Sequence, residues 1–494
     1  MADYPQRSGF LKMTNKFFLK ASKFFLYLVP FTILVVSRST LFPFIVGKYF
    51  FFRVFVDLAL IAFVWAWAKG ELSANSQQPI NNKNNKPASF SARKLLSSPL
   101  VIAVFVFTFI FLLAGFLGYN PSASFWSNFE RGEGGLQILH LFIFFALMVL
   151  LFRDEKSWRK MLKLSILAAV LMISYGLLAA VYNKAGQQVF PSFMGPSLCD
   201  PNVRFSGSLG NPAYLGTFMI FSLFFTAVLL NKGWKVYKKW LKWLLAGLLV
   251  FFSLALLFSQ TRGALLGLIA GIIFGLFYLL FSLPKGKMRK IVFAGTVIFI
   301  IIGGLVFQFR HSLNLMPFCK NDTGANRILD ITPDATSFQT RLLLWKQALI
   351  LTKERPLLGW GPENFSPAFE KHYRPEFTVW FDRAHSVYFD YLAETGILGF
   401  LSYLGIFAVF YWQFFKKMTI GKNLLSAQSG LPADKKDSAN ARLFRNALFF
   451  ALPVAYLVQG IVLFEVLPIY ICLFTFLAFM NFKFNETRGT DIKI

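Results

Sequence analysis

The stretch DRAHSVYFDYLAETGILG, residues 382–399, carries the chain from a polar surface into a membrane. It places His385 beside Ser386, and from Ile397 an apolar run continues as a segment long enough to cross a bilayer. The stretch therefore predicts a histidine at a membrane surface. Histidine has an ordinary pKa near neutrality, so His385 can serve as a proton acceptor; the alternative is that it only marks the start of an interfacial helix.

The composition of the whole chain is that of a membrane protein. Of its 494 residues, 56% are hydrophobic and only 15% are charged. Apolar runs of about 20 residues recur, and each is long enough to cross a bilayer core of about 30 Å. We predict an all-α, polytopic integral membrane protein with about 12 transmembrane helices and a long outer-face loop before the tenth.

The expected spans follow one another closely. They cover residues 24–46, 50–68, 99–117, 135–152, 161–182, 212–230, 243–258, 264–283, 291–309, 386–414, 447–464 and 467–482. The resulting division is a cytoplasmic basic segment (1–23), nine helices (24–309), an outer loop with an amphipathic helix (310–384), three helices (385–482) and a cytoplasmic tail (483–494).

The formal charge of +28 has two readings. In a soluble protein it would indicate nucleic acid, because clustered Lys and Arg neutralise phosphates. Here the basic clusters fall in alternate short loops, which is typical of cytoplasmic loops. We therefore expect a lipid bilayer and no nucleic acid as the partner, with both termini cytoplasmic and the first span retained rather than cleaved as a signal peptide.

Two further features fall in the loops assigned to the outer face. Cys199 and Cys319 both lie there, so a disulfide between them is allowed, although their spacing does not establish that they are close. None of the three cysteines has metal-ligand spacing. In the long loop, apolar residues at helical spacing from Phe338 to Leu349 predict an interfacial helix that stops at Pro356.

The candidate site consists of polar residues expected on the outer side. Arg204 follows the fifth span, Arg262 lies in the tight turn SQTRG, and His385 precedes the tenth span. Two guanidinium groups match the oxygens of a diphosphate, and the histidine could act as general base on a hydroxyl. Taken alone, Arg204 could equally be an ordinary loop charge. Secondary candidates are Arg341, His372 and Arg383.

Four motifs in this order resemble the O-antigen ligase and O-antigen polymerase superfamily, which includes bacterial protein O-oligosaccharyltransferases. They are RFSGSLGNP, SQTRGALLG, RLLLWKQALILTKERPLLGWGPENF and HSVYFDYLAETGILG, within residues 200–405. The N-terminal spans resemble the family only in hydropathy.

The resemblance implies an inverting glycosyltransferase that needs no metal or other cofactor. It would move a glycan from undecaprenyl diphosphate to an acceptor hydroxyl at the outer face of the bacterial inner membrane. Arg204 and Arg262 would hold the diphosphate, and His385 would activate the acceptor.

The acceptor stays open at this point. It could be lipid A core, as in an O-antigen ligase, or a polysaccharide or protein, as in the polymerase or the protein O-oligosaccharyltransferase. A transporter or flippase of lipid-linked sugars is the alternative of another class. Such proteins tend to have inverted repeats and ionisable residues at mid-membrane, and this chain has no clear internal repeat.

Overall fold

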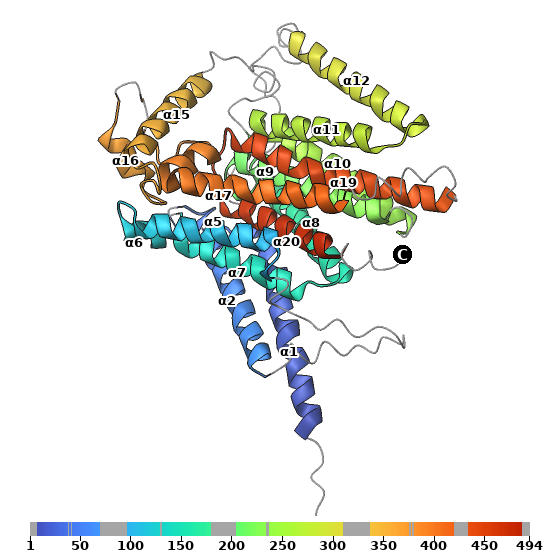
Figure 1. Ribbon diagram of the computed structural model, residues 1–494, viewed down its shortest axis with the longest axis horizontal. Coiled ribbons are helices and arrows are strands. Elements are labelled where there is room, and N and C mark those ends of the chain that lie inside the picture. Colours follow the sequence, from blue (N-terminus) through green and yellow to red (C-terminus); the bar gives the residue numbers. More distant parts are fainter. Residues whose placement is uncertain are drawn as a thin grey trace, which may run out of the picture.

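The structure is a computed structural model, and Figure 1 shows it as a bundle of long helices. It describes residues 7–37, 39–40, 42–69, 96–128, 131–178, 204–233, 237–309, 336–374, 377, 380–418 and 433–486. All regular elements in these ranges are helical. Cys199 and Cys319, between which the sequence allows a disulfide, lie outside them, whereas Cys472 is a buried free thiol.

The helices follow the expected spans closely. Their bounds are α1 (Arg7–Leu28), α2 (Val46–Ala68), α5 (Pro99–Phe116), α6 (Pro121–Trp126), α7 (Gly135–Leu151), α8 (Glu155–Leu178), α9 (Pro212–Gly233), α10 (Lys239–Phe258), α11 (Arg262–Ser282), α12 (Lys287–Gln308), α15 (Thr336–Glu354), α16 (Phe365–Lys371), α17 (Val387–Met418), α19 (Ala433–Gly460) and α20 (Leu467–Glu486). Among the described residues, 11 helical segments are long and apolar enough to span a membrane, and α7 is a shorter apolar helix. The predicted polytopic all-α fold is confirmed.

The first span differs from the prediction in its limits. Its membrane-length part is Phe17–Leu34, and it ends 12 residues before the expected end at residue 46. The last turns tighten into a 3₁₀ helix, Val29–Leu34, with Pro30 near its start. Proline has no backbone N–H to continue an α-helix, so the change of helix type at this point has a local cause.

The helices differ greatly in how much of their surface they bury. In the apolar stretch of α20, 94% of the residues are buried inside the protein, compared with 11% in that of α12. Figure 1 accordingly shows α20 within the bundle and α12 at its edge. We conclude that α20 is the central helix and that α12 contributes little to the core.

A break in α17 shapes one end of the bundle. Gly396 has φ 64° and ψ −168°, a conformation that essentially only glycine adopts. The backbone groups released by the break pair with the loop before α16. Trp360 and Gly361 N–H donate to the carbonyls of Ala393 and Glu394 at 2.9 and 2.8 Å, and Ile397 N–H donates to the carbonyl of Pro356 at 2.8 Å. The break is thus satisfied inside the protein, as backbone at membrane depth must be.

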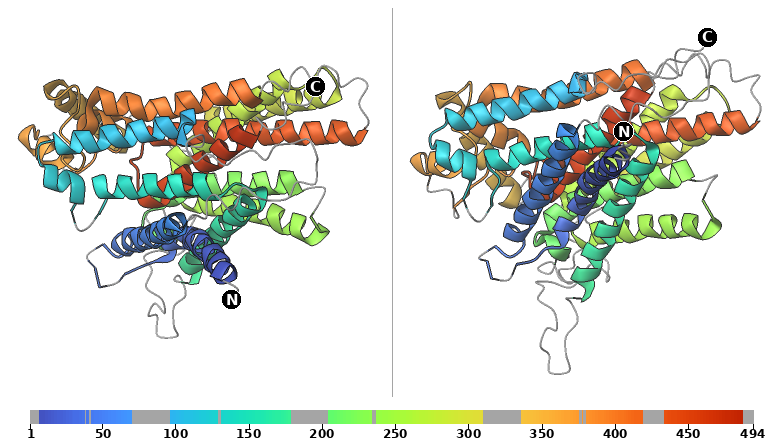
Figure 2. Two further views of the ribbon diagram at one scale, coloured as in Figure 1. Left: turned by 60° about the horizontal axis from the view of Figure 1, so that its bottom comes forward. Right: turned by 90° about the horizontal axis from the view of Figure 1, so that it is seen from below.

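The loop helices α15 and α16 cover this end. In both views of Figure 2 they lie together at one end of the bundle, in orange. The predicted helix before Pro356 is confirmed as α15, but Leu349 of the expected apolar face is 45% exposed, whereas Leu344 is fully buried. Leu344, Trp360 and Phe369 belong to a small separate core. That core holds the loop against α17.

Candidate active site

His385 lies just before α17 in a constrained backbone. Its φ is 56°, in the left-handed backbone region that residues other than glycine adopt uncommonly. Its ring packs edge to face against Phe381 and Phe464, with centroids 5.6 and 5.3 Å apart. These contacts fix the direction of the imidazole.

One hydrogen bond defines which nitrogen of His385 is basic. Nδ1 lies 3.2 Å from the carbonyl oxygen of Arg383. A carbonyl only accepts, so Nδ1 carries the hydrogen and Nε2 is the nitrogen with a lone pair. Burial lowers the pKa of His385, the bond to Arg383 opposes this, and the nearby charge of Arg341 lowers it further. His385 is therefore a neutral imidazole at pH 7, the form that can accept a proton.

The structure brings Arg204 to the turn that contains Arg262. The Arg204 guanidinium donates from Nε to the carbonyl of Ser259 at 3.0 Å and from Nη2 to Oγ1 of Thr261 at 2.9 Å. Thr261 is the residue before α11, whose first residue is Arg262. The two arginines expected to act together are thus anchored at one turn.

The connection between α19 and α20 touches both parts of the site. Gly263, next to Arg262, packs so tightly that an added Cβ would lie 2.4 Å from Cγ2 of Val462. The residue after Val462 is Leu463, whose carbonyl accepts from Val387 N–H at 2.9 Å. The next residue, Phe464, is the aromatic partner of His385. A short segment therefore connects the arginine turn with the histidine.

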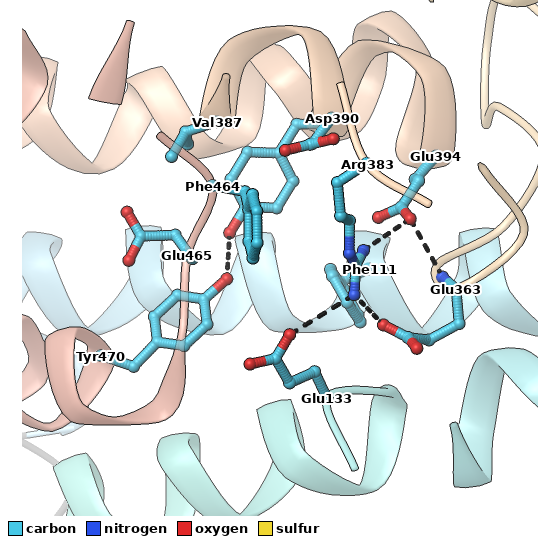
Figure 3. Close-up of a pocket in the computed structure, with 11 residues that line it drawn as sticks. Phe111, Glu133, Glu363, Arg383, Val387, Asp390, Glu394, Phe464, Glu465 and Tyr470 are labelled. Carbon is cyan, nitrogen blue, oxygen red and sulfur yellow. Dashed lines mark hydrogen bonds and ion pairs between the residues drawn. The ribbon is translucent and has the colours of Figure 1, made fainter. Parts of the chain in front are cut away.

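Arg383 lies within a buried group of carboxylates, shown in Figure 3. Its guanidinium donates to Glu394 at 2.7 Å and to Glu133 at 3.5 Å, and it also pairs with Glu363. These carboxylates come from α17, from the segment before α7 and from the loop before α16, so one arginine ties three parts of the chain together. Arg383 is 8% exposed, and the surrounding carboxylates hold its pKa well above the ordinary value in spite of the burial.

The same pocket contains acids that Arg383 does not contact directly. Asp390 accepts the N–H of Ala384 through Oδ1 at 2.6 Å, and Glu465 accepts the hydroxyl of Tyr456. Their other oxygens are buried without a hydrogen-bond partner. Burial raises the pKa of Glu465 to about 8 and, despite the nearby Arg383, that of Glu133 to about 7. Glu133 and Glu465 are therefore partly protonated near neutral pH.

Backbone strain is concentrated around these residues. Four residues other than glycine have positive φ in the described ranges, and three of them are Gln260 (49°), Glu363 (63°) and His385 (56°). Gln260 lies in the arginine turn, and Glu363 binds Arg383. Such conformations cost about 1–3 kcal/mol each and are typical of functional sites.

The secondary candidates have different surroundings. Arg383 contacts His385 through its carbonyl, and Arg341 on α15 lies near enough for its charge to affect the pKa of the imidazole. His372 follows α16 and pairs with Glu354 of α15. The fold thus pairs His372 with the end of the loop helix α15.

Sequence reasoning missed Arg131 and Phe464. Arg131 lies over the ring of Phe464 at 5.4 Å and pairs with Asp382. Phe464 also meets Tyr214 edge to face at 5.8 Å. Neither residue belongs to the motifs quoted above, and only the fold places both beside His385. The described ranges contain no group of three or more His, Cys, Asp or Glu arranged to hold a metal ion.

Comparison with known proteins adds the family. Residues 246–404 match the model of the family described as O-Antigen ligase. The match runs from α10 into α17, so it contains Arg262, Arg383 and His385, while Arg204 precedes it. No curated protein gives a significant match to the chain. The resemblance expected from the motifs is confirmed for residues 246–404: this part of the multi-pass membrane protein is similar to the O-antigen ligase family.

Proposed function

We propose that the protein is a glycosyltransferase that moves a glycan from undecaprenyl diphosphate to an acceptor hydroxyl. The reaction takes place at the outer face of the bacterial inner membrane, with both termini in the cytoplasm. The observation that carries the proposal is the Nδ1 bond of His385 to the carbonyl of Arg383, which leaves Nε2 as the proton acceptor. The family match supports the class of reaction.

In this proposal the acceptor hydroxyl attacks the anomeric carbon of the glycan. The bond between that carbon and the diphosphate oxygen breaks, and undecaprenyl diphosphate leaves as an anion. The hydroxyl proton moves to Nε2 of His385. The configuration at the anomeric carbon inverts, because attack and departure occur on opposite faces.

Arg204 and Arg262 are assigned to the diphosphate. Two cations at one turn stabilise the charge that develops on the leaving group, which is the main requirement of this step. Arg204 already donates to Ser259 and Thr261, so it also holds the turn in shape. Arg383 is assigned a positioning role, since its carbonyl orients the imidazole and its side chain is fixed by three glutamates.

The acceptor separates the ligase from its relatives. We place the protein on the ligase branch, with lipid A core as the acceptor, and a polysaccharide or protein acceptor would assign it to the polymerase or the protein O-oligosaccharyltransferase.

The test is transfer by the purified protein in detergent, supplied with undecaprenyl diphosphate-linked glycan and each acceptor in turn. We expect one acceptor to be glycosylated, with inverted configuration by NMR and at an undiminished rate in chelator. Binding of the carrier without transfer to any acceptor, together with its movement across vesicles, would overturn the proposal in favour of a flippase.

A further inference from the structure

Lys48 is a buried lysine without an acidic partner in the described part of the chain. It lies in the first turn of α2 and is 2% exposed. Its ammonium donates to the carbonyl of Val35 at 2.6 Å, and no ion pair joins it to a described carboxylate. Burial of an ammonium without a counter-charge is costly, and an anion bound beside Lys48 would supply the missing counter-charge.

Lys48 lines a second pocket together with Arg131. The other lining residues are mostly apolar or aromatic, among them Tyr49 and Tyr214. The acid among them is Glu133. The two acids nearby do not supply Lys48 with a partner. Asp382 pairs with Arg131. Glu133 accepts from the guanidinium of Arg383, and burial raises the pKa of Glu133 to about 7. The pocket therefore contains two basic side chains, and neither of the nearby acids pairs with Lys48.

The pocket lies beside the proposed reaction centre. The guanidinium of Arg131 lies 5.4 Å from the centre of the Phe464 ring. The centres of the His385 and Phe464 rings are 5.3 Å apart, so both residues contact Phe464. Tyr214 lines the pocket and belongs to the segment that follows Arg204. The cavity volume of about 20 Å³ holds one or two waters, so it fits oxygens of an anionic group and excludes a whole sugar ring.

We propose that the pocket of Lys48 and Arg131 binds the oxygens of a phosphate group carried by one of the two substrates. The inference rests on the proposed function for the identity of the substrates. The group is either part of the donor's diphosphate or a phosphate on the acceptor, and the two have the same chemistry at the pocket. In both cases the amine of Lys48 and the guanidinium of Arg131, which also pairs with Asp382, would donate to the phosphate oxygens.

The test uses the full-length protein with Lys48→Met and, should that variant fold poorly, Lys48→Gln. The matched control is Lys290→Met, on the exposed first turn of α12. We expect Lys48→Met to raise KM about 10- to 100-fold for one substrate while the control leaves both KM values unchanged. A higher KM for the donor identifies the donor's diphosphate as the ligand. A higher KM for the acceptor, seen only when the acceptor carries its phosphate, identifies the acceptor's phosphate as the ligand.

A second measurement does not depend on transfer. Inorganic pyrophosphate should raise the thermal unfolding temperature of the wild type more than that of Lys48→Met. If both KM values and the pyrophosphate effect are unchanged in Lys48→Met, the pocket is not an anion site, although the glycosyltransferase proposal would stand. If the wild type transfers nothing, the pyrophosphate measurement alone still decides the pocket.

Discussion

The arginine turn and the Arg383 pocket are both charged, but they are built in different ways. Arg204 and Arg262 come from two short polar motifs. The Arg204 side chain donates to Thr261, and Arg262 is the next residue, the first of α11. Arg383 lies among carboxylates from three separate segments, buried and fully paired. The surroundings of Arg383 are those of a cation that holds the protein in shape, and the arginine turn is where we propose that the diphosphate binds. Variants at each should therefore fail in different ways.

The largest effect is expected for Arg383→Met. The change leaves Glu133, Glu363 and Glu394 buried without their counter-charge, and loss of one partner of a buried pair costs about 3–5 kcal/mol. Thermal unfolding in detergent should show a large fall in stability, with transfer lost as well. Arg374→Met, at an exposed arginine, is the control and should unfold like the wild type. Equal stability of the two variants would mean that the pocket does not hold the fold.

A smaller loss of stability is expected for Gly396→Ala. An added Cβ would lie 2.4 Å from the backbone of Leu357, and the backbone of Gly396 would become strained. We expect a loss of about 3 kcal/mol in the free energy of unfolding. Gly405→Ala in the same helix is the matched control, since its Cβ would meet nothing within 4 Å. If Gly396→Ala is as stable as Gly405→Ala, the break in α17 is not required.

Arg262→Lys tests the other region. Lysine keeps the charge but not the planar fork, so transfer should fall about 10- to 100-fold with little change in unfolding temperature. Arg442→Lys, at an exposed position on α19, should have no effect. Near-normal transfer by Arg262→Lys would show that only the charge is needed at this turn.

The smallest effect is a displacement of the pH profile. His385 must be neutral to accept a proton, and burial lowers its pKa below the ordinary 6.5. Transfer should therefore rise with pH through the lowered pKa and reach its plateau below the pH at which an exposed histidine would. The profile of kcat/KM against pH measures this acidic limb. A limb at or above pH 6.5 would contradict the neutral state assigned to His385.

The sequence predicted the spans well because each is a long, mainly apolar run. It also predicts a common side for Arg204, Arg262 and His385, because they follow the fifth, seventh and ninth expected spans. It could not find the pairing of Arg383 with Glu133, since these residues are far apart in the chain and only packing brings them together. It also missed the end of the first span at Leu34, where the apolar run continues after the helix has changed type.

The most direct test of the account is transfer by His385→Asn. Asparagine adopts the left-handed backbone of residue 385 more readily than most residues, so this variant removes the base without adding strain. The account predicts an unchanged unfolding temperature and a fall in transfer of about 10²- to 10⁴-fold. Transfer within about threefold of the wild-type rate, on the scale where tenfold is about 1.4 kcal/mol, would contradict the role of His385 as the base.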